Sequence, residues 1–111
     1  TLALIQRSMK EEESRCKQQL SLLRLREEAS EDKAAVELSL VADAQRKITA
    51  LPSKQQDSTM LRRLEEKERQ TRMRLAADKA EIQRVRAAVR ADRFRQQLML
   101  QEQSEEFVRA R

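Results

Sequence analysis

The stretch Leu51-Pro52-Ser53-Lys54-Gln55-Gln56-Asp57-Ser58-Thr59 is the clearest interruption in this sequence. Proline lacks a backbone donor and biases the residue before it away from the helical region. The residues between Pro52 and Thr59 carry no apolar side chain, as is typical of an exposed loop. We therefore predict a polar turn at residues 52–59. The sequence offers three caps for a following helix, namely a capping box of Ser53 with Gln56, or Asp57 or Ser58 as the N-cap.

On both sides of this turn the composition is typical of long helices. Charged residues make up 39% of the 111 residues and aromatic residues only 2%, and the sequence contains no Gly, Trp, Tyr or His. Globular cores normally use several aromatic side chains, because each buries a large area. Enrichment in Ala, Leu, Glu, Lys and Arg instead favours long helices and coiled coils. Disorder is the competing interpretation of so polar a chain, but the apolar residues recur at helical spacing. We predict a first helix at 1–51 and a second, basic helix at 60–111.

The apolar residues of the first segment fall into two registers. The first register comprises Leu2, Ile5, Met9, Cys16, Leu20 and Leu23. The second comprises Leu22, Leu25, Ala29, Val36, Leu40, Ala44, Ile48 and Leu51. The two overlap at residues 20–25, so we predict that the apolar stripe shifts around the helix there, as at a stutter in a heptad pattern.

The second segment follows one heptad frame, which is interrupted at Glu68, Thr71 and Asp78. Its a and d positions hold Leu61, Leu64, Leu75, Ile82, Val85 and Val89. Together with four residues of the first segment, these form the predicted helix seam. Those four residues are Leu20, Leu23, Val36 and Ile48.

A short polar turn makes antiparallel packing of the two helices favourable, because each helix has a tethered partner nearby. Folding the chain about Lys54 or Gln55 tests this arrangement, and apolar residues then face each other. The pairs are Ile48 with Leu61, Val36 with Met73, Leu23 with Val85, and Leu20 with Val89. The alternative is a parallel dimeric coiled-coil spacer, kinked or broken at Pro52. We predict an all-α fold in which two long helices form one antiparallel coiled-coil hairpin, which could also form a homo-oligomer.

The net charge of +5 is concentrated in the second segment. Arg72, Lys79, Arg86 and Arg93 repeat every seven residues at the e position of the heptad frame. One interpretation is that these side chains cover the seam and pair with Glu residues of the first helix. The other is a basic ridge that binds an acidic partner such as a microtubule or nucleic acid. The candidate partner-binding residues are Arg72, Lys79, Arg86, Arg93, Arg62, Arg69 and Arg90. Nucleic acid is the weaker choice, because the sequence has no interleaved aromatics and no recognisable motif.

Several other classes of function are disfavoured by the sequence. The longest apolar stretches, such as 38–42, are too short to cross a membrane, and Thr1–Ile5 leads into charged residues, unlike a signal peptide. Cys16 is the only cysteine, so we predict neither an intrachain disulfide nor a zinc site, and no cofactor. No nucleophile has a base and no Gly-rich phosphate loop exists, so we predict a non-enzymatic protein. We expect a piece of a longer cytoplasmic protein, because the chain lacks an initiator Met and signs of secretion.

Two stretches carry a resemblance to a known family. They are Gln19-Leu20-Ser21-Leu22-Leu23-Arg24-Leu25-Arg26-Glu27 and Leu75-Ala76-Ala77-Asp78-Lys79-Ala80-Glu81-Ile82-Gln83-Arg84-Val85. In sequence and order they resemble a coiled-coil segment of the large centrosome-associated proteins that recruit FOP to centrioles. The short loop and the Arg-rich second helix depart from that pattern. The resemblance implies a scaffolding role at centrosomes, basal bodies, axonemes or microtubules. We expect protein partners, either tubulin and microtubules or a centrosomal protein, and the resemblance carries over no individual functional residue.

Overall fold

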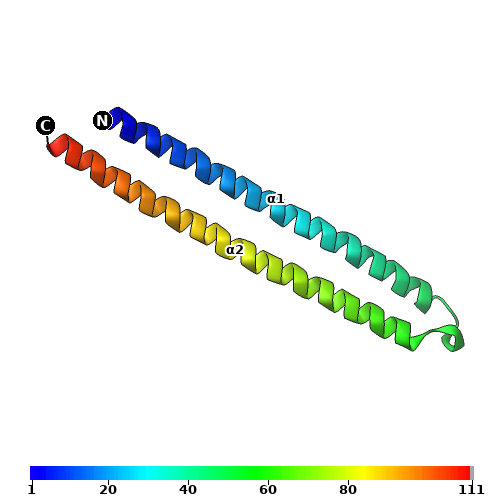
Figure 1. Cartoon of the computed structure of the whole chain (residues 1–111). Coiled ribbons are helices and arrows are strands. Elements are labelled where there is room, and N and C mark those ends of the chain that lie inside the picture. Colours follow the sequence, from blue (N-terminus) through cyan, green and yellow to red (C-terminus); the bar gives the residue numbers. More distant parts are fainter. Residues whose placement is uncertain (111) are drawn as a thin grey trace. The chain divides into compact units, whose positions relative to one another are not determined.

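A computed structural model describes residues 1–110, which form two long helices and no strand (Figure 1). Helix α1 spans Leu2–Thr49, a short 3-10 helix η1 spans Ser53–Gln55, and helix α2 spans Ser58–Arg109. The predicted all-α hairpin with its turn near Pro52 is therefore confirmed. The last position predicted for the second helix, Arg111, lies outside the described residues.

The carboxylate of Asp57 caps the N-terminus of α2. Its Oδ1 accepts hydrogen bonds from the backbone N–H groups of Thr59 at 2.9 Å and Met60 at 3.2 Å. These are two of the four N–H groups that a helix leaves without a partner at its N-terminus. Among the caps that the sequence leaves open, the structure thus selects Asp57.

The side chain of Gln56 satisfies the C-terminus of α1. Helices commonly end in a glycine with left-handed backbone geometry, but this chain has no Gly and no described residue has a positive φ. The amide Nε2 of Gln56 instead donates to the carbonyl oxygens of Leu51 at 2.9 Å and Thr49 at 3.3 Å. One polar turn therefore caps both helices.

Replacing Asp57 with Ala should lower the free energy of unfolding by about 1 kcal/mol, within the range of about 0.5–2 found for lost N-caps. Ser58→Ala is the matched control, because Ser58 lies next to Asp57 at the start of α2. Urea denaturation followed by circular dichroism measures both variants. Equal losses of unfolding free energy in the two variants would mean that Asp57 does not stabilise α2 as its N-cap.

The chain divides into two compact units. The loop unit is Arg26–Glu81 and contains the turn. Within it α1 and α2 run antiparallel (Figure 1), since Arg26 contacts Glu81 at 3.3 Å and Ser30 Oγ donates to Asp78 at 2.9 Å. Both contacts agree within one residue with a fold about Lys54. The unit buries Ala34, Val41 and Thr71.

The terminal unit combines Thr1–Leu25 with the chain from Ile82 onward. Its buried residues are Cys16, Leu23 and Ile82, and the side chain of Ile82 is fully buried. An ion pair between Arg93 and Glu13, at 3.7 Å, joins the two helices within this unit. The thiol of Cys16 is free and buried.

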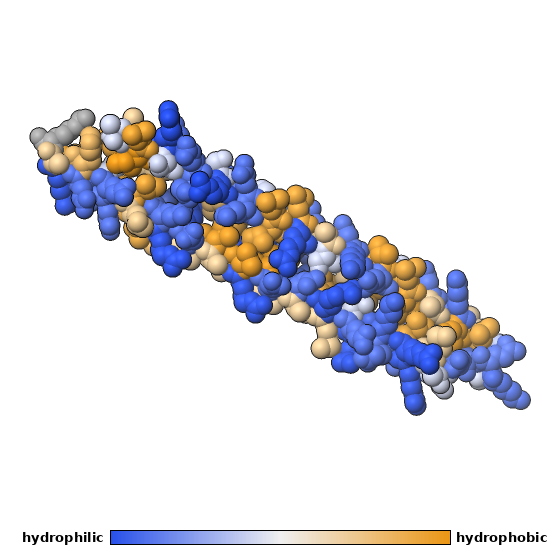
Figure 2. Space-filling view, viewed as in Figure 1, coloured by the Kyte–Doolittle hydropathy of each residue, from blue (hydrophilic) through white to orange (hydrophobic). Residues whose placement is uncertain are grey.

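The predicted shift of the apolar stripe on α1 is wrong between residues 22 and 40, although Ala44 and Ile48 of the second register are half-buried. Four apolar residues of the second register are between 60% and 66% exposed, namely Leu22, Leu25, Val36 and Leu40. Figure 2 shows apolar patches at the surface among the hydrophilic side chains. The first register continues instead through Ala34 and Val41, and half-buried Ser30 and Glu37 lie on the same face of the helix. The physical reason lies on α2, where Thr71 and Asp78 occupy the seam and need hydrogen-bond partners. Ser30 and Glu37 supply those partners.

Candidate partner-binding site

Most of the ten predicted seam residues lie between the helices of their own unit. Leu23 and Ile82 are buried. Those of intermediate exposure are Leu20, Ile48, Leu61, Leu64, Leu75 and Val89. Two are exposed, Val36 by 60% and Val85 by 37%. Val36 is thus removed from the seam by the register that α1 adopts, and its predicted partner Met73 is also exposed.

The four ridge residues at the e positions all have partners. Lys79 Nζ lies 3.3 Å from Glu31 and Arg93 lies 3.7 Å from Glu13, so these two pair with α1. Arg72 pairs at 3.1 Å with Glu68 of its own helix, and Arg86 also has an interaction partner. This geometry favours the interpretation in which these side chains cover the seam.

The other three predicted partner-binding residues differ from one another. Arg69 donates through Nε to Glu66 at 3.0 Å, and this carboxylate raises the pKa of Arg69. Arg62 and Arg90 form no ion pair with any residue in the described part of the chain. Arg62 lies in the loop unit and Arg90 in the terminal unit.

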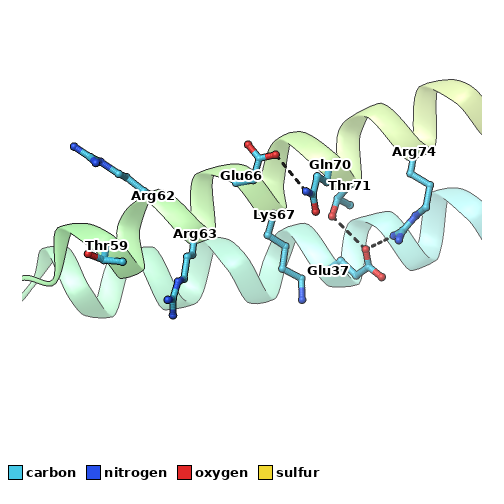
Figure 3. A pocket seen from close by; sticks show the side chains of 9 residues that line it. All are labelled: Glu37, Thr59, Arg62, Arg63, Glu66, Lys67, Gln70, Thr71 and Arg74. Carbon is cyan, nitrogen blue, oxygen red and sulfur yellow. Dashed lines mark hydrogen bonds and ion pairs between the residues drawn. The ribbon is translucent and has the colours of Figure 1, made fainter.

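Arg62 belongs to a groove of about 550 Å³ in the loop unit, which we call the basic groove (Figure 3). It is lined by Glu37, Thr59, Arg62, Arg63, Glu66, Lys67, Gln70, Thr71 and Arg74. Both Arg63 and Lys67 point from α2 toward the side of α1, and Arg62 points away from it (Figure 3). Like Arg62, these two cations form no ion pair within residues 1–110. The groove therefore presents three uncompensated positive charges within two turns of helix.

Both acidic residues of the groove are already engaged. Glu37 accepts hydrogen bonds from Thr71 Oγ1, at 3.3 Å, and from Arg74. Glu66 accepts from Arg69 and, at 3.2 Å, from Gln70. The Arg74 guanidinium holds the pKa of Glu37 below its ordinary value of 4.5, with a smaller contribution from Thr71. Likewise, the hydrogen bond from Arg69 lowers the pKa of Glu66. Neither carboxylate is left to neutralise the three cations.

These lowered pKa values predict how stability depends on pH. A carboxyl group whose pKa is lower in the folded state stabilises the fold fully above pH 4.5, and this stabilisation is lost as the pH falls through the folded-state pKa. We expect the urea midpoint to fall on acidification below that value. Glu37→Gln should make this fall smaller. The matched control is Glu65→Gln, which removes an exposed carboxylate that forms no ion pair among the described residues. An acid profile identical in the two variants would contradict the role assigned to Glu37.

Of the residues that line the basic groove, only Arg62 was predicted from the sequence; Arg63, Lys67 and the Glu37–Arg74 pair were not. The sequence does contain a feature that marks the three cations as lacking an ion pair within their own helix. Helical ion pairs favour an acid three or four residues before the base. None of the three cations has such an acid, because the preceding positions hold only Ser58, Thr59, Met60, Arg63 and Leu64. The pairing of Glu37 with Arg74 depends on the register of α1 and so could not be read from the sequence.

The described residues contain no cluster of three or more acidic, Cys or His side chains that could hold a metal ion. Among the same residues, no helix is both long and apolar enough to cross a membrane. The chemistry available to the basic groove is the binding of anionic groups by charge and hydrogen bonding.

The chain is similar to a segment of Centrosome-associated protein 350 from Mus musculus, with 39% identity over 105 residues. The match covers 95% of this chain and 3% of the length of that relative. The resemblance drawn from the sequence is therefore confirmed. No protein family profile matches the chain. Solved structures show no significant similarity to it.

Proposed function

We propose that this chain is a non-enzymatic coiled-coil module of a centrosomal or microtubule-associated scaffold. The similarity to a centrosome-associated protein supports this role, and so does a fold in which two helices present long charged surfaces. The module acts at the cytoskeleton, at a centrosome, basal body or axoneme. Its partners are other proteins or microtubules.

The basic groove is the site that contacts the partner. The observation that carries this proposal is the set of three cations that line the basic groove without an ion pair among the described residues, namely Arg62, Arg63 and Lys67. A carboxylate-rich segment, such as an acidic surface of tubulin, satisfies these charges without breaking an existing ion pair. Binding of this kind is steered by charge and weakens as salt rises. The ridge residues are a less favourable site, because Lys79 and Arg93 must first leave Glu31 and Glu13.

The test compares two sets of substitutions by Gln, which keeps helix propensity close to that of Arg and Lys. The groove variant combines Arg62→Gln, Arg63→Gln and Lys67→Gln. The ridge variant removes four positive charges, one more than the groove variant. It combines Arg72→Gln, Lys79→Gln, Arg86→Gln and Arg93→Gln. We expect the groove variant to keep its stability and to bind microtubules about tenfold or more weakly, with reduced salt dependence. The ridge variant should lose about 1 kcal/mol or less of stability per ion pair. Its affinity for microtubules should stay closer to that of the parent than the affinity of the groove variant does.

Co-sedimentation with microtubules across a salt series, with duplex DNA in parallel, provides the measurement. Loss of binding in the ridge variant alone would move the site to the ridge. Preference for DNA at physiological salt would favour a basic nucleic-acid- or chromatin-binding helix pair. Binding to neither would leave a structural spacer with no partner at this groove.

A further inference from the structure

The face of α2 that points away from α1 in the terminal unit carries an apolar patch. Ala87, Ala91, Phe94 and Leu98 share this face, because they follow one another at intervals of three and four residues. All four are exposed, Phe94 by 62% and Leu98 by 42%. We call these four residues the α2 outer patch.

The arrangement of small and large residues allows the patches of two copies of the chain to pack against each other. Two antiparallel copies of α2, related by a twofold axis near Gln96, place Phe94 of each copy against Leu98 of the other. The four large side chains then meet at the axis. The alanines flank them and allow the helix backbones to approach closely. A twofold interface of this type is self-complementary, because each copy contributes the same surface.

Charge beside the patch favours the same arrangement. Arg84 and Glu106 lie along one edge of the patch, on opposite sides of Phe94 and Leu98 along the chain. Both are exposed, and neither forms an ion pair within the described part of the chain. Antiparallel pairing about Gln96 brings the same edges of the two helices together and sets Arg84 nearly level with Glu106 of the second copy. Parallel pairing would leave these residues several turns apart.

We propose that the α2 outer patch is a homodimer interface, in which a second copy of this chain packs antiparallel on Phe94 and Leu98 with an Arg84–Glu106 pair at each end. This association is independent of the partner proposed for the basic groove, which lies in the loop unit. It buries two exposed large apolar residues per copy and satisfies four charges that have no partner in a single chain. An interface of this size predicts a weak, concentration-dependent dimer.

Sedimentation equilibrium of the whole chain over a wide concentration range tests the proposal. The parent should self-associate reversibly to a dimer. Phe94→Glu with Leu98→Glu should raise the dimer dissociation constant by about tenfold or more, because it removes the central anchors and adds like charges. Val36→Glu with Leu40→Glu is the matched control, since these residues have the same spacing and are 60% and 64% exposed on α1. Circular dichroism establishes that both variants remain helical.

Charge exchange tests the antiparallel orientation. Arg84→Glu and Glu106→Arg should each weaken the dimer, and the double variant should recover the parent dissociation constant. A chain that is monomeric at every concentration would overturn the proposal. So would a dimer that the control pair weakens as much as the patch pair. Failure of the double variant to recover would overturn the antiparallel arrangement.

Discussion

Replacing Ile82 with Ala is expected to lower the free energy of unfolding by about 2–5 kcal/mol, the usual cost of truncating a buried Ile. Ile82 has an exposure of 0% and is the largest fully buried side chain of the described residues. Truncation removes its apolar contacts and leaves a cavity between the helices of the terminal unit, because neighbouring side chains collapse only partly into the space. The loss should appear as a lower urea midpoint.

Gln83→Ala is the control for this measurement. Gln83 is the next residue of α2 and is exposed, so its truncation should change stability by about 0.5 kcal/mol or less. Comparable losses in the two variants would mean that the core of the terminal unit does not centre on Ile82. Because the partner helix is tethered in the same chain, dilution should leave the difference between the variants unchanged.

A second large effect is expected from Ala34→Phe in the loop unit. Ala34 is only 3% exposed, so α2 covers this position closely and leaves no room for a larger side chain. Adding an aromatic ring forces side chains from their preferred rotamers or moves the helices apart, which typically costs about 1–3 kcal/mol. A lower melting temperature and a lower urea midpoint would report this cost.

The neighbouring substitution Ala35→Phe isolates the steric effect. Ala35 is exposed on the same helix, and the difference in helix propensity between Ala and Phe is the same at both positions. Only the packing against α2 differs. If Ala35→Phe proved as destabilising as Ala34→Phe, the register that the structure assigns to α1 would be wrong.

Local features of the sequence were enough to predict the secondary structure and the hairpin. Pro52 and the polar residues after it predicted the turn, and helix-forming residues on both sides predicted the two helices. The heptad frame of α2 placed Leu61, Leu64, Leu75 and Ile82 toward the partner helix, because a single helix carries its own periodicity. The tether between the helices then favoured antiparallel packing.

The candidate site could be predicted only in part. Arg62 was identified from the charge of the second segment, but so were Lys79 and Arg93, which the structure pairs with Glu31 and Glu13. Whether a cation is compensated depends on which carboxylate of the other helix lies opposite it. That assignment is a property of the interhelical register and is absent from the local pattern of charge.

The sequence by itself thus determined two helices, their polar turn and the apolar face of α2. Only the tertiary structure decided which face of α1 meets α2. On hydrophobicity alone Val36 and Leu40 were the better candidates, yet they remain exposed while Ser30 and Glu37 face the partner. The reason is that Thr71 and Asp78 already occupy the seam of α2, and polar groups placed between helices are stable only with hydrogen-bond partners. Which face of one helix is buried therefore depends on the polar and apolar residues that the opposite helix presents.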